Sequence, residues 1–348
     1  MSEQVETSPQ SFSYAIALTM TAVPLLETRN LSKQFIIGNR FTAHGLRTVH
    51  AVDNVSLKIM PGETMGLVGE SGCGKSTLGR CMTRLYDITA GELYFEGADI
   101  SKKSLRQMRP LRRRMQMVFQ DPYASLNPRR RVRDLIAEPL RVHLRLSEAE
   151  IRDRVGKLLD VVGLSPDHMV RFPHEFSGGQ RQRIGIARAI ALEPSLIVAD
   201  EPVSALDVSV QAQIVNLLAD LQERLNLTYV FIAHDLSVVR QISTRIAVMY
   251  LGSIVELGNA ADIFAKPSHP YTQALISAVP QPDLKKAGER KRIVLTGDVP
   301  SPIDPPQGCR FHPRCSFATD KCKQERPALL PLPNGRTVAC HYPLNMSA

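Results

Sequence analysis

The stretch GESGCGKST, residues 69–77, constrains this chain more than any other part of its sequence. It matches a phosphate-binding loop and lies between an apolar run, TMGLVG, and a helical pattern, LGRCMTRL. Such a loop works where a buried strand ends and a helix begins, because the helix N-terminus supplies unpaired N–H groups for phosphates. The sequence therefore predicts a nucleotide site on a strand–loop–helix unit, and a chance glycine-rich turn is the weaker explanation.

Specific roles follow for residues in and near this loop. We expect Lys75 to reach the β and γ phosphates and Ser76 to hold Mg²⁺, while added bulk at Cys73 would block the nucleotide. Asp200 and Glu201 end the run LIVADE, and adjacent residues at a strand end point in different directions. Asp200 can then serve the metal, and Glu201 can accept a proton from the attacking water. A solvated acidic pair at a turn is the alternative.

Apolar runs alternate with helical patterns along most of the chain. The runs at 64–69, 196–202 and 228–235 are typical of buried strands, and 210–225 repeats apolar residues with helical spacing. This alternation predicts an α/β layered core. Strand patterns are absent from residues 121–181, where the sequence instead predicts a helical insert.

The octapeptide FSGGQRQR, residues 176–183, is a second candidate anion site. A Ser followed by two glycines and a helix leaves several backbone N–H groups facing outward. Ser-Gly-Gly is also an ordinary turn and helix cap, so the stretch does not decide between these readings by itself.

The charge distribution is compatible with several partners, and the N-terminal stretch with more than one start. Lys and Arg outnumber Asp and Glu by 43 to 34, with basic runs at 106–114 and 127–133 that suit nucleic acid, anionic lipid or simple solvation. The apolar stretch 13–26 is too short to span a membrane and contains Pro24. We expect residues 1–24 to be poorly ordered, with Met20 a possible start, and the chain to remain in the cytosol.

Five motifs occur here in one order: MVFQDP, FSGGQ, LIVADEP, SALD and IAHD, after the phosphate loop. Over residues 26–258 the chain resembles the ATP-binding-cassette (ABC) ATPase subunits. The resemblance implies a cassette at 25–261 with a RecA-like P-loop NTPase core, an antiparallel β subdomain and a helical subdomain at about 121–181. Such cassettes pair head to tail, so the FSGGQ of one closes over the ATP held by the other.

The resemblance also implies a complete set of site residues. Gln120 would contact Mg²⁺ and the attacking water, and His234 would hold the γ-phosphate. Mg²⁺ would be bound by Ser76, Gln120 and Asp200, and Phe35 would stack on adenine. The nucleotide contacts would come from Gly69, Ser71, Gly72, Cys73, Gly74, Lys75, Ser76 and Thr77, and across the dimer from Ser177, Gly178, Gly179, Gln180 and Asp207.

The Pro- and Cys-rich region 262–348 reads as a separate, loop-rich extension. Its stretch KPSHPYTQALISAVP resembles the C-terminal extension of oligopeptide and dipeptide importer ATPases, especially the second, F-type, subunit. This implies a heterodimer with a related ATPase, two transmembrane permease subunits, and an extracytoplasmic solute-binding protein, at the cytoplasmic face of the cell membrane. Glutathione, nickel or opine-like solutes are alternatives to peptides. A soluble nucleic-acid ATPase is the other class, although we expect no nucleic-acid partner.

Four cysteines lie in this extension: Cys309, Cys315, Cys322 and Cys340. Structural zinc sites usually bring their ligands in close pairs, and no such pair is present. The wide spacing favours a 4Fe-4S cluster, which some ATPases with this extension carry, over zinc or free thiols. We expect a structural role, because the extension lies outside the ATP motifs.

Overall fold

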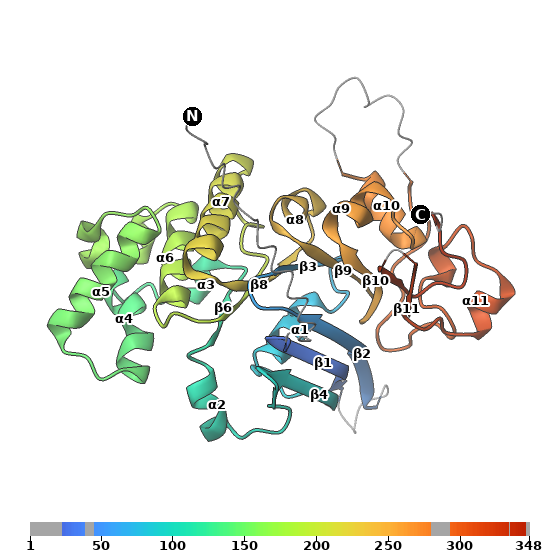
Figure 1. The fold of residues 1–348 in the computed structure, drawn as a ribbon, viewed down its shortest axis with the longest axis horizontal. Coiled ribbons are helices and arrows are strands. Elements are labelled where there is room, and N and C mark those ends of the chain that lie inside the picture. Colours follow the sequence, from blue (N-terminus) through green and yellow to red (C-terminus); the bar gives the residue numbers. More distant parts are fainter. Residues whose placement is uncertain (1–22, 39–44, 280–292, 334, 346–348) are drawn as a thin grey trace, which may run out of the picture.

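The computed structural model describes residues 23–38, 45–279, 293–333 and 335–345 (Figure 1). The N-terminal extension predicted at 1–24, including the possible start at Met20, lies almost entirely outside these ranges. Among the described residues, no helix combines the length and the apolar character needed to cross a bilayer.

An eight-stranded sheet forms the centre, in the order β11-β12-β10-β9-β3-β8-β7-β6. Strands β6, β7, β8, β3 and β9 are parallel to one another, and β10 and β12 add antiparallel pairs at one end. The parallel strands are β3 (Thr64–Val68), β6 (Met115–Val118), β7 (Leu196–Asp200), β8 (Thr228–Ala233) and β9 (Arg245–Tyr250). Every residue of β3, β7 and β8 is buried, as expected for strands covered on both faces.

Alternate residues of these strands belong to two separate hydrophobic clusters. In β7, Leu196 and Val198 pack on one face with α1 (Lys75–Met82), while Ile197 and Ala199 pack on the other. That second face is covered by α7 (Val208–Leu225) and α8 (Leu236–Ile242), on the opposite side of the sheet from α1 (Figure 1). The period of two along each strand separates these clusters, and the predicted α/β class is confirmed.

A second, four-stranded antiparallel sheet packs over α1 (Figure 1). Its order is β2-β1-β4-β5, from β1 (Leu26–Ile37), β2 (Arg47–Ile59), β4 (Ala90–Phe95) and β5 (Ala98–Asp99). Buried residues of β1 and β2, such as Leu31 and Val52, join the cluster on the α1 face of the main sheet.

Helices fill the chain between β6 and β7. They are α3 (Pro122–Ser125), α4 (Val132–His143), α5 (Glu148–Val161) and α6 (Gly178–Ile190), with two short 3₁₀ turns before α6. Ser147 caps α5: its backbone N–H donates to Glu150 Oε2 at 2.8 Å, in a reciprocal capping box. The basic run near 106–114 carries α2 (Leu105–Leu111).

The C-terminal extension joins the core and is not the separate appendage that its composition suggested. β12 (Thr337–Val338) pairs with β10 (Ser253–Asn259), and β11 (Leu330–Pro331) pairs with β12. The extension also contributes α10 (Pro270–Ser277) after α9 (Ala260–Ala265), and α11 (Asp320–Gln324). Glu256 of β10 is fully buried and accepts the N–H groups of Ser268 and His269, which fixes the start of α10.

His269 gives this junction a pH dependence. It is almost fully buried, and its Nδ1 accepts the Tyr271 N–H at 3.0 Å as the cap of α10. Burial lowers its pKa from 6.5 to about 3, opposed by a hydrogen bond with the Ala339 backbone. The unfolded chain therefore binds a proton below pH 6.5 that the folded chain rejects. The stability that the folded state gains by keeping His269 neutral is complete above pH 6.5 and is lost as pH falls toward 3.

We predict that His269→Asn removes part of the acid sensitivity of folding. Asn preserves a side-chain acceptor at the cap but does not titrate. Between pH 7.5 and 5.5 the wild type should lose about 1.4 kcal/mol more unfolding free energy than the variant, measured by chemical denaturation at both pH values. The exposed His174→Asn should behave like wild type. Parallel pH profiles for wild type and His269→Asn would contradict the prediction.

Candidate functional site

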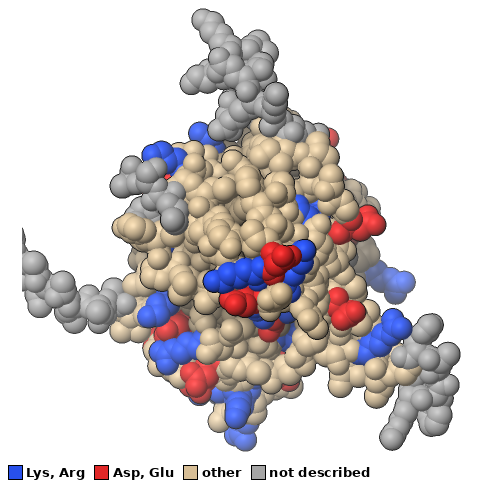
Figure 2. Space-filling model, turned by 90° about the vertical axis from the view of Figure 1, so that its right-hand side faces the viewer, with Lys and Arg blue, Asp and Glu red and all other residues tan. Residues whose placement is uncertain are grey.

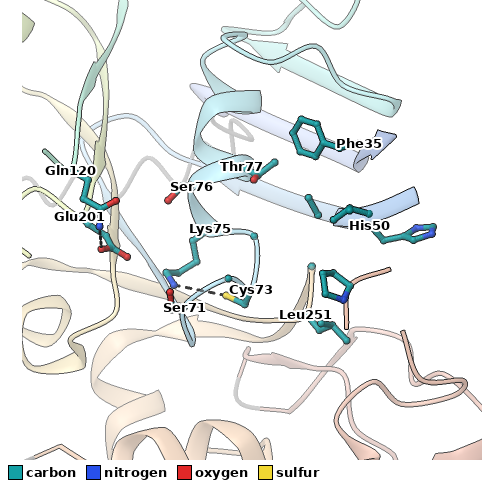
Figure 3. Close-up of a pocket in the computed structure, with 16 residues that line it drawn as sticks. Phe35, His50, Ser71, Cys73, Lys75, Ser76, Thr77, Gln120, Glu201 and Leu251 are labelled. Atoms are coloured by element: carbon teal, nitrogen blue, oxygen red, sulfur yellow. Dashed lines mark hydrogen bonds between the residues drawn. The ribbon is translucent and has the colours of Figure 1, made fainter. Parts of the chain in front are cut away.

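The phosphate loop connects β3 to α1 and forms one wall of an open pocket (Figure 3). Gly74 precedes α1 with φ of 104°, and a Cβ there would lie 2.1 Å from the Ala51 carbonyl oxygen. Only glycine fits this close left-handed approach. The pocket is lined by Phe35, Val49, His50, Ala51, Ser71, Gly72, Cys73, Gly74, Lys75, Ser76, Thr77, Gln120, Glu201, Leu251, Gly252 and Pro302.

Lys75 lies within the curve of the loop. Its side chain is buried, and Nζ donates to the carbonyl oxygens of Gly69 at 2.8 Å and Glu70 at 3.0 Å. The Cys73 side chain, within the loop, is buried, and burial raises the pKa of its thiol. A Cβ on Gly69 would lie 2.8 Å from the Cys73 sulfur, so Cys73 fills a tight space against the loop.

Ser76 and Asp200, which we predicted to hold Mg²⁺, are in direct contact. The Ser76 hydroxyl donates to Asp200 Oδ1 at 2.7 Å. Asp200 is almost fully buried at the end of β7, and burial raises the pKa of its carboxyl while the Ser76 hydrogen bond opposes that shift. A hydroxyl and a carboxylate are oxygen ligands of the kind that Mg²⁺ prefers.

Glu201 lies beside Gln120 and His234. Gln120 Nε2 donates to Glu201 Oε2 at 2.7 Å (Figure 3), and His234 Nδ1 lies 3.4 Å from the same oxygen. Glu201 has φ of 47°, which turns the chain immediately after Asp200 and directs the two carboxylates to different partners. The structure thus gathers the three residues that we predicted for catalysis at one edge of the sheet.

The predicted residues at 177–180 and Asp207 do not line this pocket. Ser177 and Gln180 form a capping box at the start of α6, so the helix-cap reading of the motif holds within the chain. A Cβ on Gly179 would lie 2.4 Å from Val210 Cγ1, so this glycine allows α6 to approach α7 closely. Ser177 and Asp207 are exposed.

Phe35 lies at the far side of the pocket from Gln120 (Figure 3). Its ring packs edge-on to Tyr86 with 5.6 Å between centroids, and Lys33 Nζ lies 4.9 Å from its centroid. Adenine stacking on this ring stays a prediction. Sequence reasoning missed His50 and Pro302, which line the pocket from other parts of the chain and carry no motif.

The four late cysteines line one small pocket with Phe311 and Phe317. Burial raises the pKa values of Cys309, Cys315 and Cys340, the last to about 11. Within the described ranges, no three His, Cys, Asp or Glu side chains are arranged to hold one metal ion.

The extension lies outside the ATP motifs in the sequence, but the structure brings it into contact with the phosphate loop and its pocket. Pro302 lines the nucleotide pocket, and its carbonyl accepts the His50 N–H at 2.9 Å. Arg314 donates to both carboxylate oxygens of Glu70 in the phosphate loop, at 2.6 and 3.0 Å. Composition could not reveal these contacts because they join segments far apart in the sequence.

Known proteins resemble both parts of the chain. The profile of the family described as ABC transporter matches residues 52–204, and that of the oligopeptide/dipeptide transporter C-terminal region matches 255–322. The putative oligopeptide transport ATP-binding protein YkfD of Bacillus subtilis (strain 168) is 52% identical, covering 92% of this chain and 96% of its own length. The oligopeptide transport ATP-binding protein AppF of the same organism is 53% identical, covering 91% and 97%.

Solved structures agree with the fold. The cassette MJ0796, as a post-hydrolysis dimer bound to ADP and Pi, aligns with a TM-score of 0.61 and 30% identity over 68% of this chain and 98% of its own. CbiO1 from Clostridium perfringens, part of the transporter complex cbiONQ, aligns with a TM-score of 0.60 and 28% identity over 70% and 91%. From its motifs, fold and relatives, this chain belongs to the ABC transporter family, as an ATP-binding subunit of the oligopeptide/dipeptide type.

Proposed function

We propose that this chain hydrolyses ATP as one half of a cassette pair that powers the import of peptides. The observation that carries the proposal is the contact of Gln120 with Glu201, 2.7 Å apart, at the rim of the phosphate-loop pocket. It supports the proposal because a carboxylate and an amide lie together beside the loop that we expect to hold the γ-phosphate, so they could act on an attacking water molecule. The names of YkfD and AppF, oligopeptide transport ATP-binding proteins, support the substrate class.

In this mechanism the loop N–H groups and Lys75 bind the phosphates, and Glu201 accepts a proton from the attacking water. Gln120 and His234 orient the water and the γ-phosphate. Ser76 and Asp200 fit Mg²⁺, because their oxygens already meet at 2.7 Å beside the loop. Bound there, the ion would neutralise charge on the phosphates.

We predict that Glu201→Gln retains ATP binding but lowers hydrolysis about 10²-fold or more, because the proton acceptor is lost. The variant should accumulate as an ATP-bound dimer, measured by phosphate release and by light scattering. Glu223→Gln, an exposed carboxylate of α7, is the matched control and should hydrolyse ATP normally. Hydrolysis by Glu201→Gln at near wild-type rates would remove Glu201 from the mechanism.

The exposed Ser177 and Asp207 support a pairing of two cassettes. Both belong to predicted nucleotide contacts and yet lie outside the pocket of their own chain. In a head-to-tail pair, residues 177–180 and Asp207 would complete the ATP site of the partner. MJ0796, a relative in fold and sequence, is described as a dimer. We propose a related ATPase chain as the partner.

A groove beside the helical region is our candidate contact for the permease subunits. It lies between the main sheet and α4, and its lining includes Leu85, Phe119 and Val142, which are 44%, 37% and 50% exposed. Phe119 directly precedes Gln120, so an occupant of the groove would be next to the catalytic edge. A short cytoplasmic helix of each permease with an apolar face would fit. This would hold the chain at the cytoplasmic face of the membrane.

We predict that Val142→Glu weakens assembly with the permeases, because it places a charge among the exposed apolar side chains of the groove. Co-purification of the complex should fall while the ATPase activity of the isolated subunit is retained. Leu330→Glu, at an exposed apolar position in β11, is the control and should assemble normally. Full assembly and transport by Val142→Glu would exclude this groove as the docking site.

Peptides are the proposed cargo, delivered by an extracytoplasmic binding protein. Glutathione, nickel and opine-like solutes are alternatives that uptake assays with the complete transporter would separate. A nucleic-acid ATPase requires DNA-stimulated hydrolysis and a steep salt dependence. On the face shown in Figure 2, Lys and Arg lie interspersed with Asp and Glu, which is unlike a basic stripe for phosphates.

We also propose that the four cysteines hold a 4Fe-4S cluster. They line one pocket, and their wide spacing in the sequence, without a close pair, favours a larger group over zinc. Four thiolates from Cys309, Cys315, Cys322 and Cys340 would bind it. The buried ring of Phe311 would shield one side of it from water. Its contribution would be to hold the segments of the extension together.

We predict that anaerobically purified protein is brown and contains about four iron and four sulfide per chain. Cys315→Ser should lose the colour and increase proteolysis of the extension, whereas Cys81→Ser, a buried cysteine of α1, should remain brown. Colourless protein with stoichiometric zinc would show that the cysteines bind zinc and not a 4Fe-4S cluster. Metal-free protein with a protease-resistant extension would exclude both.

A further inference from the structure

Glu70, the second residue of the phosphate loop, is held by the C-terminal extension at two points. Its backbone N–H donates to the Tyr271 hydroxyl oxygen at 2.8 Å, and Tyr271 is fully buried in α10. Its carboxylate accepts hydrogen bonds from both terminal nitrogens of Arg314, at 2.6 and 3.0 Å. The Arg314 side chain is only 7% exposed. The two parallel hydrogen bonds between Arg314 and Glu70, shielded on the arginine side, fix the orientation of both side chains.

The same residue contacts the lysine that we expect to meet the phosphates. Lys75 Nζ donates to the Glu70 carbonyl oxygen at 3.0 Å. The N–H and the carboxylate of Glu70 are therefore fixed by the extension, and its carbonyl is fixed by the loop lysine. A displacement of Arg314 would change the position of Glu70 and, through it, that of Lys75.

Charge gives a second reason for the pair. A carboxylate in a loop that binds phosphate repels its ligand, because like charges within a few ångströms interact unfavourably. Arg314 supplies the opposite charge at 2.6 Å. The hydrogen bond with Glu70 raises the pKa of Arg314, so the guanidinium stays charged.

An aromatic cluster supports this contact from below. The rings of Tyr250, Tyr271 and Phe311 lie 4.7 to 5.4 Å apart, and they join β9 to two parts of the extension, α10 and the segment around Phe311. Arg310, next to Phe311, donates to the carbonyl of Leu251, which lines the nucleotide pocket. The extension therefore contacts the pocket next to a buried, well-packed aromatic cluster.

We propose that the extension is part of the nucleotide site, and that Arg314 is a positioning residue that holds the phosphate loop and neutralises Glu70. The proposal rests on the ATPase function and adds a determinant of ATP affinity outside the cassette motifs. Arg314 directly precedes Cys315, so the segment that lines the four-cysteine pocket also holds the phosphate loop.

The test compares Arg314→Met with Lys323→Met in the full chain. Both remove one ion pair of the extension, but Lys323 pairs with Asp320 at the exposed surface of α11. With a fluorescent ATP analogue as the probe, Arg314→Met should bind about tenfold more weakly, and Lys323→Met should bind like wild type. The KM for ATP should rise in parallel, while kcat at saturating ATP stays within about twofold, because Glu201 and Gln120 are untouched.

Two further variants separate positioning from misfolding. Arg314→Lys keeps the charge but cannot form two parallel bonds, and should bind about threefold more weakly even if Arg314→Met fails to fold. Adding Glu70→Gln to Arg314→Met should recover part of the affinity, because no unpaired carboxylate remains. Wild-type affinity in folded Arg314→Met or Arg314→Lys would overturn this inference alone. A wild-type protein that neither binds nor hydrolyses ATP would overturn the proposed function.

Discussion

The carboxyl ends of parallel strands meet at one edge of the main sheet, and the chemistry of this protein depends on that edge. The loop after β3 supplies N–H groups and Lys75, the last residue of β7 is Asp200, and Glu201 follows it in the next turn. These strands are buried on both faces, so their ends are held by the core and the loops that follow can carry polar groups. A rigid edge brings residues more than one hundred positions apart within hydrogen-bonding distance, as for Ser76 and Asp200.

The cassette uses its glycines for two different purposes. In the phosphate loop, Gly74 allows a left-handed backbone against the Ala51 carbonyl, so N–H groups can face a ligand. In the FSGGQ motif, Gly179 allows α6 to approach α7, and Ser177 caps the helix. Capping and ligand binding are compatible, because the first turn of a helix has more N–H groups than one cap can satisfy. The motif can therefore stabilise its own chain and still present donors to a partner.

The C-terminal extension contacts both the main sheet and the phosphate loop. It adds strands to the main sheet, packs aromatic rings against β9, and contacts the first turn of the phosphate loop through Tyr271 and Arg314. Prolines and cysteines do not predict such integration, because they indicate loops without specifying what the loops touch. A segment with few helices and strands of its own can still be fixed when another domain supplies its hydrogen-bond partners.

The sequence by itself determined the α/β class, the phosphate loop and the helices between β6 and β7. Local patterns carry these features: an apolar run before GESGCGKST, Ser147 followed by Glu150, and apolar spacing in α7. The antiparallel sheet followed only from the resemblance, because the pairing of β1 with β4 joins residues about sixty positions apart. Only the tertiary structure placed His50 and Pro302 in the phosphate-loop pocket and Arg314 against Glu70. These contacts are long-range, and no local pattern records which distant side chain will neutralise a buried or crowded charge such as Glu70.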